Sequence, residues 1–401
     1  MLKYFSRYLA LVTSTCLLLA LLMACGDTNP TAGVTAATTS ATNITAATTT
    51  TVTTTAAATT ANVTTVGAVT TTAGTAGSNS TVACAAQIAA AASAQLKIGI
   101  ALQVNIPPFK AAIDGFQKGL ASCGFVEGKN VTYDLKDGQG DIPTLATIGQ
   151  QFHDKKLDLI LAIGSGALIQ MYNANKDGSI PIVFGSVADP YSALPDLIKS
   201  PTDHAFITGV QTYPPVEQAL QTLKQFLPNA KKIGIVSNTS EVNSKFAVNL
   251  IKQQGEPLGY EISVKGISKA DEVLAASQAL ATEKVDVYVA QADNTVSNAF
   301  ESMVQVSLAS KIPILAMDVG YGPRGAEVSL GLDYFVNGTS VARQTAQIFG
   351  GTKINTIPIE VQKSTNVVVN TKAASLIGIP IPDAISGVAI QKYDAITPPK
   401  K

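Results

Sequence analysis

Short apolar runs alternate with segments of helical spacing throughout the chain from Leu96 onward. The run 96–102 predicts a strand, and residues 109–123 repeat apolar side chains at the spacing of a helix. Residues 157–163 are almost all apolar, which is typical of a strand buried on both faces of a parallel sheet. Further strands are predicted at 131–135 and 180–184. This strand–helix–strand order predicts a doubly wound α/β layer.

The pattern starts again in the second half of the chain. Lys232–Ile235 repeats the sequence Lys-Ile-Gly-Ile of Lys97–Ile100, where the first half opens. The strands predicted after this restart lie at 232–236, 260–264, 285–290 and 312–316, with helices at 244–255 and 271–283. We therefore expect two similar open sheets with a cleft between them.

Length and charge agree with two lobes and exclude one class of partner. The chain has 401 residues, whereas a single domain typically has about 100 to 150. Its 28 basic and 28 acidic residues cancel, so there is no basic field for a phosphate backbone and no nucleic-acid partner is expected. Charged residues make up 14% of the chain, below the usual ~25%, and the deficit lies at the N-terminus.

An export signal is predicted over residues 1–24. Lys3 and Arg7 precede an apolar run that ends in small residues, as in a secretory signal. The end of that run, Leu22-Met23-Ala24-Cys25, resembles a bacterial lipobox. This resemblance implies that a lipid is attached to the Cys25 sulfur and that the chain is cleaved before it. The alternative is an uncleaved N-terminal anchor, and either reading places the chain outside the cytoplasm.

Residues 25–95 predict a disordered tether. The segment consists mainly of Thr, Ala, Val, Ser and Gly. Such small side chains bury too little apolar area to offset the ~1 to 2 kcal/mol of backbone entropy that each ordered residue costs. An alternative for the Ala-rich stretch 85–94 is a short helix.

Cysteine and histidine are too few for a metal site. Two of the four cysteines lie in the export signal and at the lipid site, which leaves Cys84 and Cys123. Export makes a bridge between them possible, and both the paired and the free state stay open. With only His153 and His204 in the chain and no Cys-x-x-Cys motif, we expect neither a metal nor a cofactor.

Polar residues follow several of the predicted strands, where open α/β sheets place their functional groups. Ser165 and Gly166 begin a helix directly after a buried strand, and backbone N–H groups at such a helix end suit an anion. The turns after other strands supply the further candidates Ser186, Asp189, Glu241, Asn243 and Ser244. Tight turns and helix capping are the competing explanation for residues of these types.

Two carboxylates follow neighbouring buried strands and are harder to explain as caps. Asp293 comes after the strand at 285–290, together with Asn294, and Asp318 follows the strand at 312–316. Carboxylates at such positions would receive an ammonium group. An α-amino acid also needs N–H or O–H donors for its own carboxylate. We assign its ammonium to Asp293, with help from Asp318, and its carboxylate to Ser165, Asn243 and Ser244.

Several short stretches, taken together, resemble a known family. Among them are Lys97–Ile100, Glu127–Val131, Asp189–Pro190, Asp293–Val296 and Asp333–Tyr334. Across residues 97–379 the chain resembles the extracytoplasmic substrate-binding proteins of ABC transporters, in the group that includes tryptophan- and tyrosine-binding lipoproteins. The resemblance implies a type I periplasmic-binding-protein fold, in which two Rossmann-like lobes are joined by three crossovers.

Lobe boundaries follow from this fold and the strand pattern. We expect a first lobe of 96–211 plus 318–350, a second lobe of 212–317 plus 351–385, and a C-terminal tail of 386–401. The three crossovers are then expected near 211–213, near 317–320 and near 350–354.

The resemblance implies that the protein captures a small ligand between its lobes and presents it to a membrane permease. An aromatic or other apolar amino acid is the ligand it points to. Phe109, Tyr191, Tyr213 and Tyr321 are available to stack on such a side chain, although each is also an ordinary packing residue. Relatives tend to carry an acidic residue and a histidine where this chain has Asn105 and its neighbours. Asn105 is therefore a further ligand-binding candidate, and the identity of the ligand stays open.

Three other classes of function compete with a transport-linked binding protein: an enzyme, a different binding protein and a cytoplasmic repressor. The carboxylate pair Asp293 and Asp318 resembles a glycosidase pair, but no nucleophile elbow or triad is visible, so we do not expect an enzyme. A binding protein that feeds a membrane sensor, or one that binds a nucleoside or sugar, remains an alternative. The export signal excludes a cytoplasmic repressor. The expected partners are the small ligand, a permease and, through the lipid on Cys25, the membrane; the protein itself is expected to be a monomer.

Overall fold

The computed structural model describes residues 95–363 and 365–397. The predicted export signal, the lipid site at Cys25, nearly all of the predicted tether and the last residues of the predicted tail therefore lie outside the described residues. Within the described part of the chain, no helix is both long and apolar enough to span a membrane.

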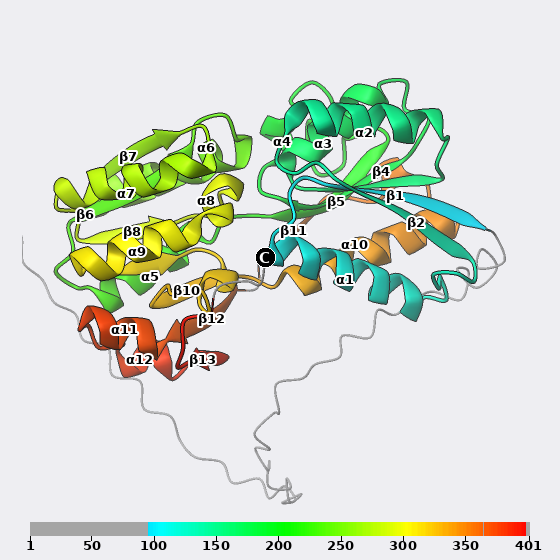
Figure 1. Ribbon diagram of the computed structural model, residues 1–401. Coiled ribbons are helices and arrows are strands. Elements are labelled where there is room, and N and C mark those ends of the chain that lie inside the picture. Colours follow the sequence, from blue (N-terminus) through cyan, green and yellow to red (C-terminus); the bar gives the residue numbers. More distant parts are fainter. Residues whose placement is uncertain (1–94, 364, 398–401) are drawn as a thin grey trace, which may run out of the picture. The chain divides into compact units, whose positions relative to one another are not determined.

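The first sheet has six parallel strands in the order β11-β5-β4-β3-β1-β2. These strands are β1 (Leu96–Leu102), β2 (Val131–Asp137), β3 (Leu159–Ile163), β4 (Ile182–Val187), β5 (Ile207–Thr212) and β11 (Glu360–Gln362). The helices of this lobe are α1 (Pro107–Ser122), α2 (Ile142–Asp154), α3 (Ser165–Ala174), α4 (Pro190–Ala193) and α10 (Tyr334–Phe349). Figure 1 shows α1 and α10 below this sheet and α2 and α3 above it.

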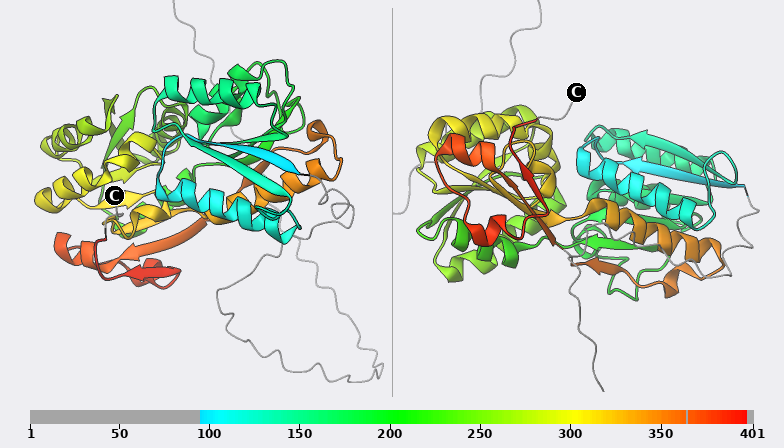
Figure 2. Two further views of the ribbon diagram at one scale, coloured as in Figure 1. Left: turned by 45° about the vertical axis from the view of Figure 1, so that its right-hand side comes forward. Right: turned by 90° about the horizontal axis from the view of Figure 1, so that it is seen from below.

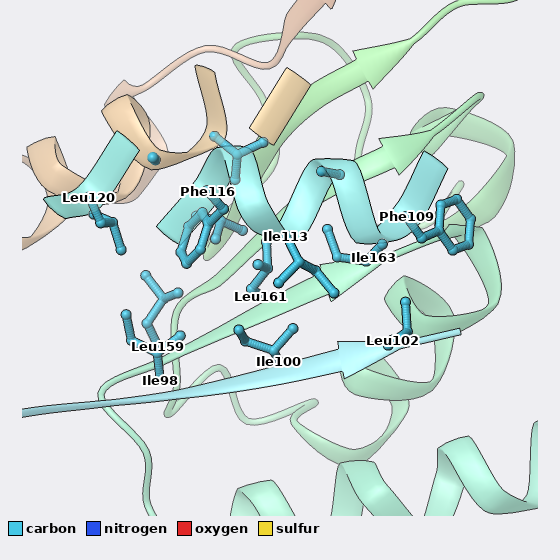
Figure 3. Close-up of a cluster of buried hydrophobic side chains, with 14 of the residues drawn as sticks. Ile98, Ile100, Leu102, Phe109, Ile113, Phe116, Leu120, Leu159, Leu161 and Ile163 are labelled. Carbon is cyan, nitrogen blue, oxygen red and sulfur yellow. The ribbon is translucent and has the colours of Figure 1, made fainter. Parts of the chain in front are cut away.

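Two apolar layers hold the first sheet between its helices. The apolar face of α1, including Phe109, Ile113 and Phe116, packs on side chains of β1 and β3 (Figure 3). A second cluster joins α2 and α3 to the opposite face of the sheet. Because β3 and β4 are buried along their whole length, their sequences are almost continuously apolar, as the sequence analysis expected.

The second sheet has seven strands in the order β13-β12-β10-β9-β8-β6-β7. They are β6 (Lys232–Asn238), β7 (Glu261–Ile267), β8 (Val287–Ala290), β9 (Ile314–Ala316), β10 (Val328–Leu332), β12 (Thr365–Asn370) and β13 (Gln391–Tyr393). Only the β10–β12 pair is antiparallel among the pairs of this sheet.

Seven helices of the described chain belong to the second lobe. They are α5 (Val216–Phe226), α6 (Val242–Gly255), α7 (Val273–Thr282), α8 (Asn294–Asn298), α9 (Phe300–Ser310), α11 (Thr371–Ile377) and α12 (Asp383–Ser386). One apolar cluster joins α7 and α9 to the sheet, and another joins α5 and α6 to it. The short 3-10 helices are η3 (Glu256–Leu258), η4 (Ala270–Glu272), η5 (Val319–Tyr321) and η6 (Ile354–Thr356).

The chain passes between the two sheets three times, as the fold prediction required. It leaves the first sheet after β5, returns to that lobe between β10 and α10, and leaves it again after β11. The fold class, an α/β protein of the type I periplasmic-binding-protein kind with two Rossmann-like lobes, is confirmed by this arrangement.

Three of the predicted boundaries need correction. The prediction placed 318–350 in the first lobe, yet β10 pairs with β9 and β12 in the second sheet. It placed 351–385 in the second lobe, yet β11 pairs with β5 in the first sheet. It treated 386–401 as a tail, yet β13 pairs with β12. β11 (Glu-Val-Gln) and β13 (Gln-Lys-Tyr) are short and mostly polar, so they lack the apolar run that marks the equally short β9. β10 was assigned to the first lobe because the second crossover was expected before it, whereas the chain crosses after it.

Glycines let α1 and α10 approach each other closely. A Cβ atom on Gly115 would lie 2.1 Å from the carbonyl oxygen of Phe335, and one on Gly338 would lie 1.9 Å from that of Ala112. No side chain fits at either position. Figures 1 and 2 show the two helices side by side, α1 in cyan and α10 in orange. This packing fixes the start of α10, which reaches the site described below.

Cys123 follows α1, is buried and forms a disulfide. It is the only cysteine among the described residues.

Candidate ligand-binding site

A pocket lies where the carboxyl ends of strands from both sheets meet. The first lobe contributes Ile106, Pro108, Phe109, Ser165, Ser186, Ala188, Thr212 and Tyr334 to its lining. The second lobe contributes Asn243, Ala247, Ala292, Asp293, Asn294, Ser297, Met317, Asp318, Tyr321 and Leu332, and Pro214 and Pro215 come from the first crossover. Open α/β sheets place ligands at such an edge. The pocket therefore occupies the position that the strand pattern predicts.

The polar lining from the first lobe includes two serine hydroxyls. Ser165 begins α3 and Ser186 lies near the end of β4. Both side chains are buried, and within the described chain neither hydroxyl oxygen has a hydrogen-bond partner. Gly164, which precedes α3, has a φ of 98°, a conformation that glycine adopts without strain. A buried hydroxyl without a partner is costly, so these groups suit a polar ligand atom.

Asp293 lies at the centre of a hydrogen-bond network in the second lobe. One carboxylate oxygen accepts from the backbone N–H of Val296 at 2.9 Å and caps α8. The other accepts from Asn238 N at 2.7 Å, from Ser244 Oγ at 2.5 Å and from Gln291 Nε2 at 3.3 Å. Burial, and then the negative charge of Glu241, raise the pKa of Asp293 above its usual range. This carboxylate therefore already accepts hydrogen bonds from four donors of the protein itself.

Glu241 holds the start of α8 from the side. Its two oxygens accept from the backbone N–H groups of Asn294 and Thr295 at 3.1 and 3.0 Å. They also accept from the side chains of Asn243, Asn294 and Thr295 at 3.0, 2.7 and 2.7 Å. Glu241 lines a second, adjoining pocket together with Gly166. Its hydrogen bonds therefore orient Asn243 and Asn294, which line both pockets.

Asp318 has fewer partners than Asp293. One oxygen accepts from the backbone N–H of Gly320 at 2.8 Å. Burial raises the pKa of Asp318 to about 6, whereas the neighbouring hydroxyl of Tyr334 acts to lower the pKa of the carboxylate. The contact with Tyr334 joins the second sheet to α10 of the first lobe. Of the two carboxylates in the pocket, Asp318 is therefore the one with more room to accept a hydrogen bond from a ligand.

Three aromatic rings line the pocket: Phe109 at the start of α1, Tyr321 in η5 and Tyr334 at the start of α10. Tyr321 packs on Phe300 with ring centroids 4.3 Å apart. The guanidinium of Arg324 lies 5.7 Å from the Tyr321 ring centroid and pairs with Glu301. These contacts fix the Tyr321 ring, so the pocket offers rigid aromatic surface to a ligand.

The structure brings half of the residues predicted for the site into this pocket, namely Ser165, Ser186, Asn243, Asp293, Asn294 and Asp318. Gly166 and Glu241 line the adjoining pocket, where the Gly166 N–H donates to Gln103 Oε1 at 2.8 Å. Ser244 lies behind Asp293 as one of its donors.

The remaining predicted residues lie elsewhere. Asp189 caps α4 through the N–H groups of Tyr191 and Ser192. Asn105 is exposed, and Tyr213 packs edge-on against Phe246. Of the four rings proposed for stacking, Phe109 and Tyr321 line the pocket, whereas Tyr191 packs into the core of the first lobe.

Tyr334 is the main lining residue that the sequence analysis did not assign. The stretch Asp333–Tyr334 resembles the family, and this resemblance was the one signal in the sequence that pointed to Tyr334. Its role was not predicted because the second crossover was expected near 317–320, whereas the chain crosses between β10 and α10, directly before Tyr334. Among the described residues no cluster of His, Cys, Asp and Glu is suited to hold a metal ion.

Comparisons with known proteins agree with the fold. Residues 97–393 match the family described as ABC transporter substrate binding protein. A tyrosine-binding protein of Clostridioides difficile (strain R20291) is 34% identical over 277 residues, which cover 69% of this chain and 79% of that protein.

Two solved structures are also similar. A conserved domain protein from Vibrio cholerae is 32% identical with a TM-score of 0.72, and the match covers 74% of this chain and 99% of that one. An ABC domain from Streptococcus pneumonia in complex with L-Trp is 28% identical with a TM-score of 0.71, covering 75% and 100%. Proteins of this family bind a transport substrate outside the cytoplasm. The chain belongs to the family of ABC transporter substrate-binding proteins.

Proposed function

We propose that the protein captures an aromatic amino acid in the pocket and delivers it to a permease. The observation that carries this proposal is the division of polar groups around the pocket. Carboxylates come from the second lobe, two serine hydroxyls without partners in the described chain come from the first lobe, and aromatic rings come from both, with the hydroxyl of Tyr321 also unpartnered in the second lobe. An amino acid carries an ammonium, a carboxylate and a side chain, so it matches all three kinds of surface.

Asp318 is the proposed partner of the ligand's ammonium group. This reverses the order expected from the sequence, in which Asp293 came first. The carboxylate of Asp293 already accepts four hydrogen bonds from the protein, whereas Asp318 accepts one, from the backbone N–H of Gly320. An ammonium group beside Asp318 would form a charge-assisted hydrogen bond, and Asp293 would add a longer-range attraction.

The ligand's carboxylate is proposed to lie on the first lobe, against Ser165 and Ser186. Both hydroxyls are buried and have no partner in the described chain. Ser165 is also the first residue of α3, a ten-residue helix, whose N-terminus carries partial positive charge. Asn243 Nδ2 donates to Glu241 and to the Ala292 carbonyl, so Asn243 has less capacity for the carboxylate than the sequence analysis expected.

The choice of an aromatic side chain rests on the lining and on the relatives. Phe109, Tyr321 and Tyr334 supply rings, and Ile106, Met317 and Leu332 add apolar contacts. A similar protein is named for tyrosine binding, and a similar structure holds L-Trp.

A calorimetric screen tests this proposal. The purified protein would be titrated with L-tyrosine, L-tryptophan, L-phenylalanine, L-leucine, adenosine and galactose. We expect saturable binding of at least one aromatic amino acid and none of galactose or adenosine. Binding of galactose or adenosine alone would replace the proposal with the alternative solute class.

Lipid anchoring is proposed from the sequence and concerns Cys25, outside the described residues. If Cys25 is lipidated, labelled palmitate enters the wild-type protein and not Cys25→Ala. Equal labelling of the two would contradict the anchor.

With Cys25 lipidated and Cys16 cleaved off with the signal, Cys84 is the proposed disulfide partner of Cys123. We further propose that the protein acts as a monomer with the permease as its membrane partner.

A further inference from the structure

Ser186 has an unusual backbone conformation for a buried residue. Its φ is 57°, in the left-handed region that residues other than glycine rarely adopt. The five other non-glycine residues with positive φ in the described chain are exposed: Gln139, Lys156, Ala205, Lys284 and Lys311. Ser186 is buried and lies within β4. Strained backbone at a buried position persists only where surrounding contacts hold it in place.

The cause of this conformation is a bulge in β4. Ile182 pairs with Ile207 and Phe184 pairs with Gly209, so a regular ladder would next pair Ser186 with Gln211. Gln211 pairs instead with Val187. Gly185 and Ser186 therefore stand opposite the single residue Val210, which is the residue count of a β-bulge. Bulges next to functional sites re-aim a side chain, and here the residue concerned lines the pocket.

The side chain of Asn337 fills the gap that the bulge opens between β4 and β5. Its Oδ1 accepts from the backbone N–H of Ser186 at 3.0 Å, and its Nδ2 donates to the carbonyl of Val210 at 3.2 Å. Asn337 is completely buried. An amide is the side chain suited to this place, because it offers one acceptor and one donor as a peptide group does.

Asn337 reaches the bulge because α10 is fixed against α1. Gly338, the next residue, allows the close approach of the two helices, since a Cβ there would lie 1.9 Å from the Ala112 carbonyl. Gly185 leaves room for the amide, because a Cβ on it would lie 3.0 Å from Asn337 Oδ1. The first turn of α10 thus supplies both a lining residue, Tyr334, and the support for Ser186.

We infer that Asn337 is a positioning residue for ligand binding: it holds the β4 bulge so that the unpartnered hydroxyl of Ser186 stays directed at the ligand. The inference rests on the proposed function for the identity of the ligand. Asn337 itself does not line the pocket. It acts through Ser186, and the effects of changing the two residues are therefore coupled.

A double-mutant cycle with L-tyrosine and L-tryptophan as probes tests the coupling. Asn337→Leu keeps the shape of the side chain and removes both hydrogen bonds. We expect it to weaken binding about tenfold in the wild-type background and less than about twofold in Ser186→Ala, because the hydroxyl it positions is then absent. In Ser165→Ala the same change should again cost about tenfold, because Ser165 does not depend on the bulge. Equal losses in all three backgrounds would overturn the inference.

Asn175 provides the matched control. It is another completely buried asparagine of the first lobe, whose Oδ1 accepts from Ile180 N at 3.1 Å and whose Nδ2 donates to the Ile180 carbonyl at 2.7 Å. Asn175 lies at the end of α3 opposite to Ser165. Asn175→Leu should lower the melting temperature. At temperatures where the variant is still folded, its affinity for the two amino acids should equal that of wild type. If both leucine variants weaken binding equally, Asn337 has only a structural role.

A ligand-free measurement separates this inference from the proposed function. Hydrogen exchange of the Ser186 amide should become faster in Asn337→Leu and stay unchanged in Asn175→Leu. If the leucine variant of Asn337 does not fold, Asn337→Asp replaces it: it keeps the acceptor for Ser186 but loses the donor to Val210 that closes the gap beside the bulge, so the Ser186 amide should again exchange faster than in wild type. Should wild type bind neither amino acid, the proposed ligand is wrong, and the exchange result decides the inference. Unchanged Ser186 exchange in the Asn337 variant that folds would overturn the inference.

Discussion

The two lobes have similar parallel sheets, yet they present different chemistry to the pocket. The first lobe contributes neutral hydroxyls at Ser165 and Ser186, whereas the second contributes the carboxylates of Asp293 and Asp318. The first lobe also has a buried aspartate, Asp189, but its carboxylate caps α4 and does not line the pocket. The fold sets where a ligand lies, and the turns after the strands decide which charge each lobe offers.

The lobes also differ in how they hold their polar groups in place. The first lobe uses backbone geometry: a glycine before α3 and a bulge in β4. The second lobe uses a side-chain network in which Asp293 and Glu241 accept hydrogen bonds from several residues around α8. Substitution of Asp293 should therefore affect both stability and binding, whereas substitution of the pocket serines of the first lobe, Ser165 and Ser186, should act mainly on binding.

The largest expected effect is on folding stability, from the aspartates that cap helices in the two lobes. Asp293→Ala leaves four buried donors without their acceptor, and at about 1 kcal/mol each the free energy of unfolding should fall by about 3 to 4 kcal/mol. Asp189→Ala removes a two-donor cap and should cost about 1 kcal/mol. Urea unfolding of both variants measures the difference, and equal losses would remove the distinction between the lobes.

Asp318→Asn should stabilise the ligand-free protein at neutral pH. Because burial raises the pKa of Asp318 to about 6, the folded chain keeps a proton that the unfolded chain releases from about pH 4 upward. Stability therefore falls as pH rises from about 4 to 6 and stays lower above that. At 1.36 kcal/mol per pKa unit, the asparagine variant should gain up to about 3 kcal/mol at pH 7.5 and nothing at pH 4. Urea unfolding at the two pH values measures this gain, and a variant less stable than wild type at pH 7.5 would contradict it.

Affinity should depend on pH in the same window. Only the ionised form of Asp318 attracts an ammonium group, and with a pKa of about 6 roughly one molecule in ten is ionised at pH 5. Binding of L-tyrosine should therefore weaken about tenfold between pH 7.5 and pH 5. The serine hydroxyls of the first lobe do not titrate in this range, and Asp293, whose pKa is also raised, acts on the proposed ammonium only at longer range. Asp318→Asn should therefore lose most of the slope. Calorimetry at four pH values measures how affinity changes with pH in wild type and in Asp318→Asn. An equal slope in the two proteins would show that another group is responsible.

Ser165→Ala should have the smallest effect. It removes one neutral hydrogen bond to the proposed carboxylate, which at about 1 kcal/mol corresponds to roughly fivefold weaker binding. The melting temperature should not fall, because the Ser165 hydroxyl has no partner in the described protein. Thermal unfolding and calorimetry of the same preparation check both parts. A lower melting temperature with unchanged affinity would make Ser165 a structural residue.

Much of the fold could be predicted from the sequence because buried parallel strands are continuously apolar. β1, β3 and β6 were found this way, and their order implied two sheets. β11 and β13 were missed because their three residues are mostly polar, whereas the equally short β9 is entirely apolar. β10 was assigned to the wrong lobe, and the crossover to α10 was misplaced with it.

The site could be predicted only in part. Residues placed at strand ends, such as Asp293 and Asp318, were identifiable because the fold brings strand ends together. The hydrogen-bond network that occupies Asp293 was not visible, since its donors come from three separate segments. The β4 bulge and Asn337 were not visible either. A bulge leaves no periodic signal, and Asn337 lies 151 residues from Ser186 in the chain.

The most direct test of the division of charge between the lobes compares two ligands. L-tyrosine and 3-(4-hydroxyphenyl)propionate differ only in the ammonium group and would be titrated into wild type and Asp318→Asn at pH 7.5. In wild type, loss of the ammonium should weaken binding by more than about thirtyfold, because a charge pair removed from water is broken. In Asp318→Asn the two ligands should bind within about threefold of each other, since the ammonium has lost its partner. An unchanged preference for L-tyrosine in Asp318→Asn would show that the ammonium lies elsewhere and would contradict the account.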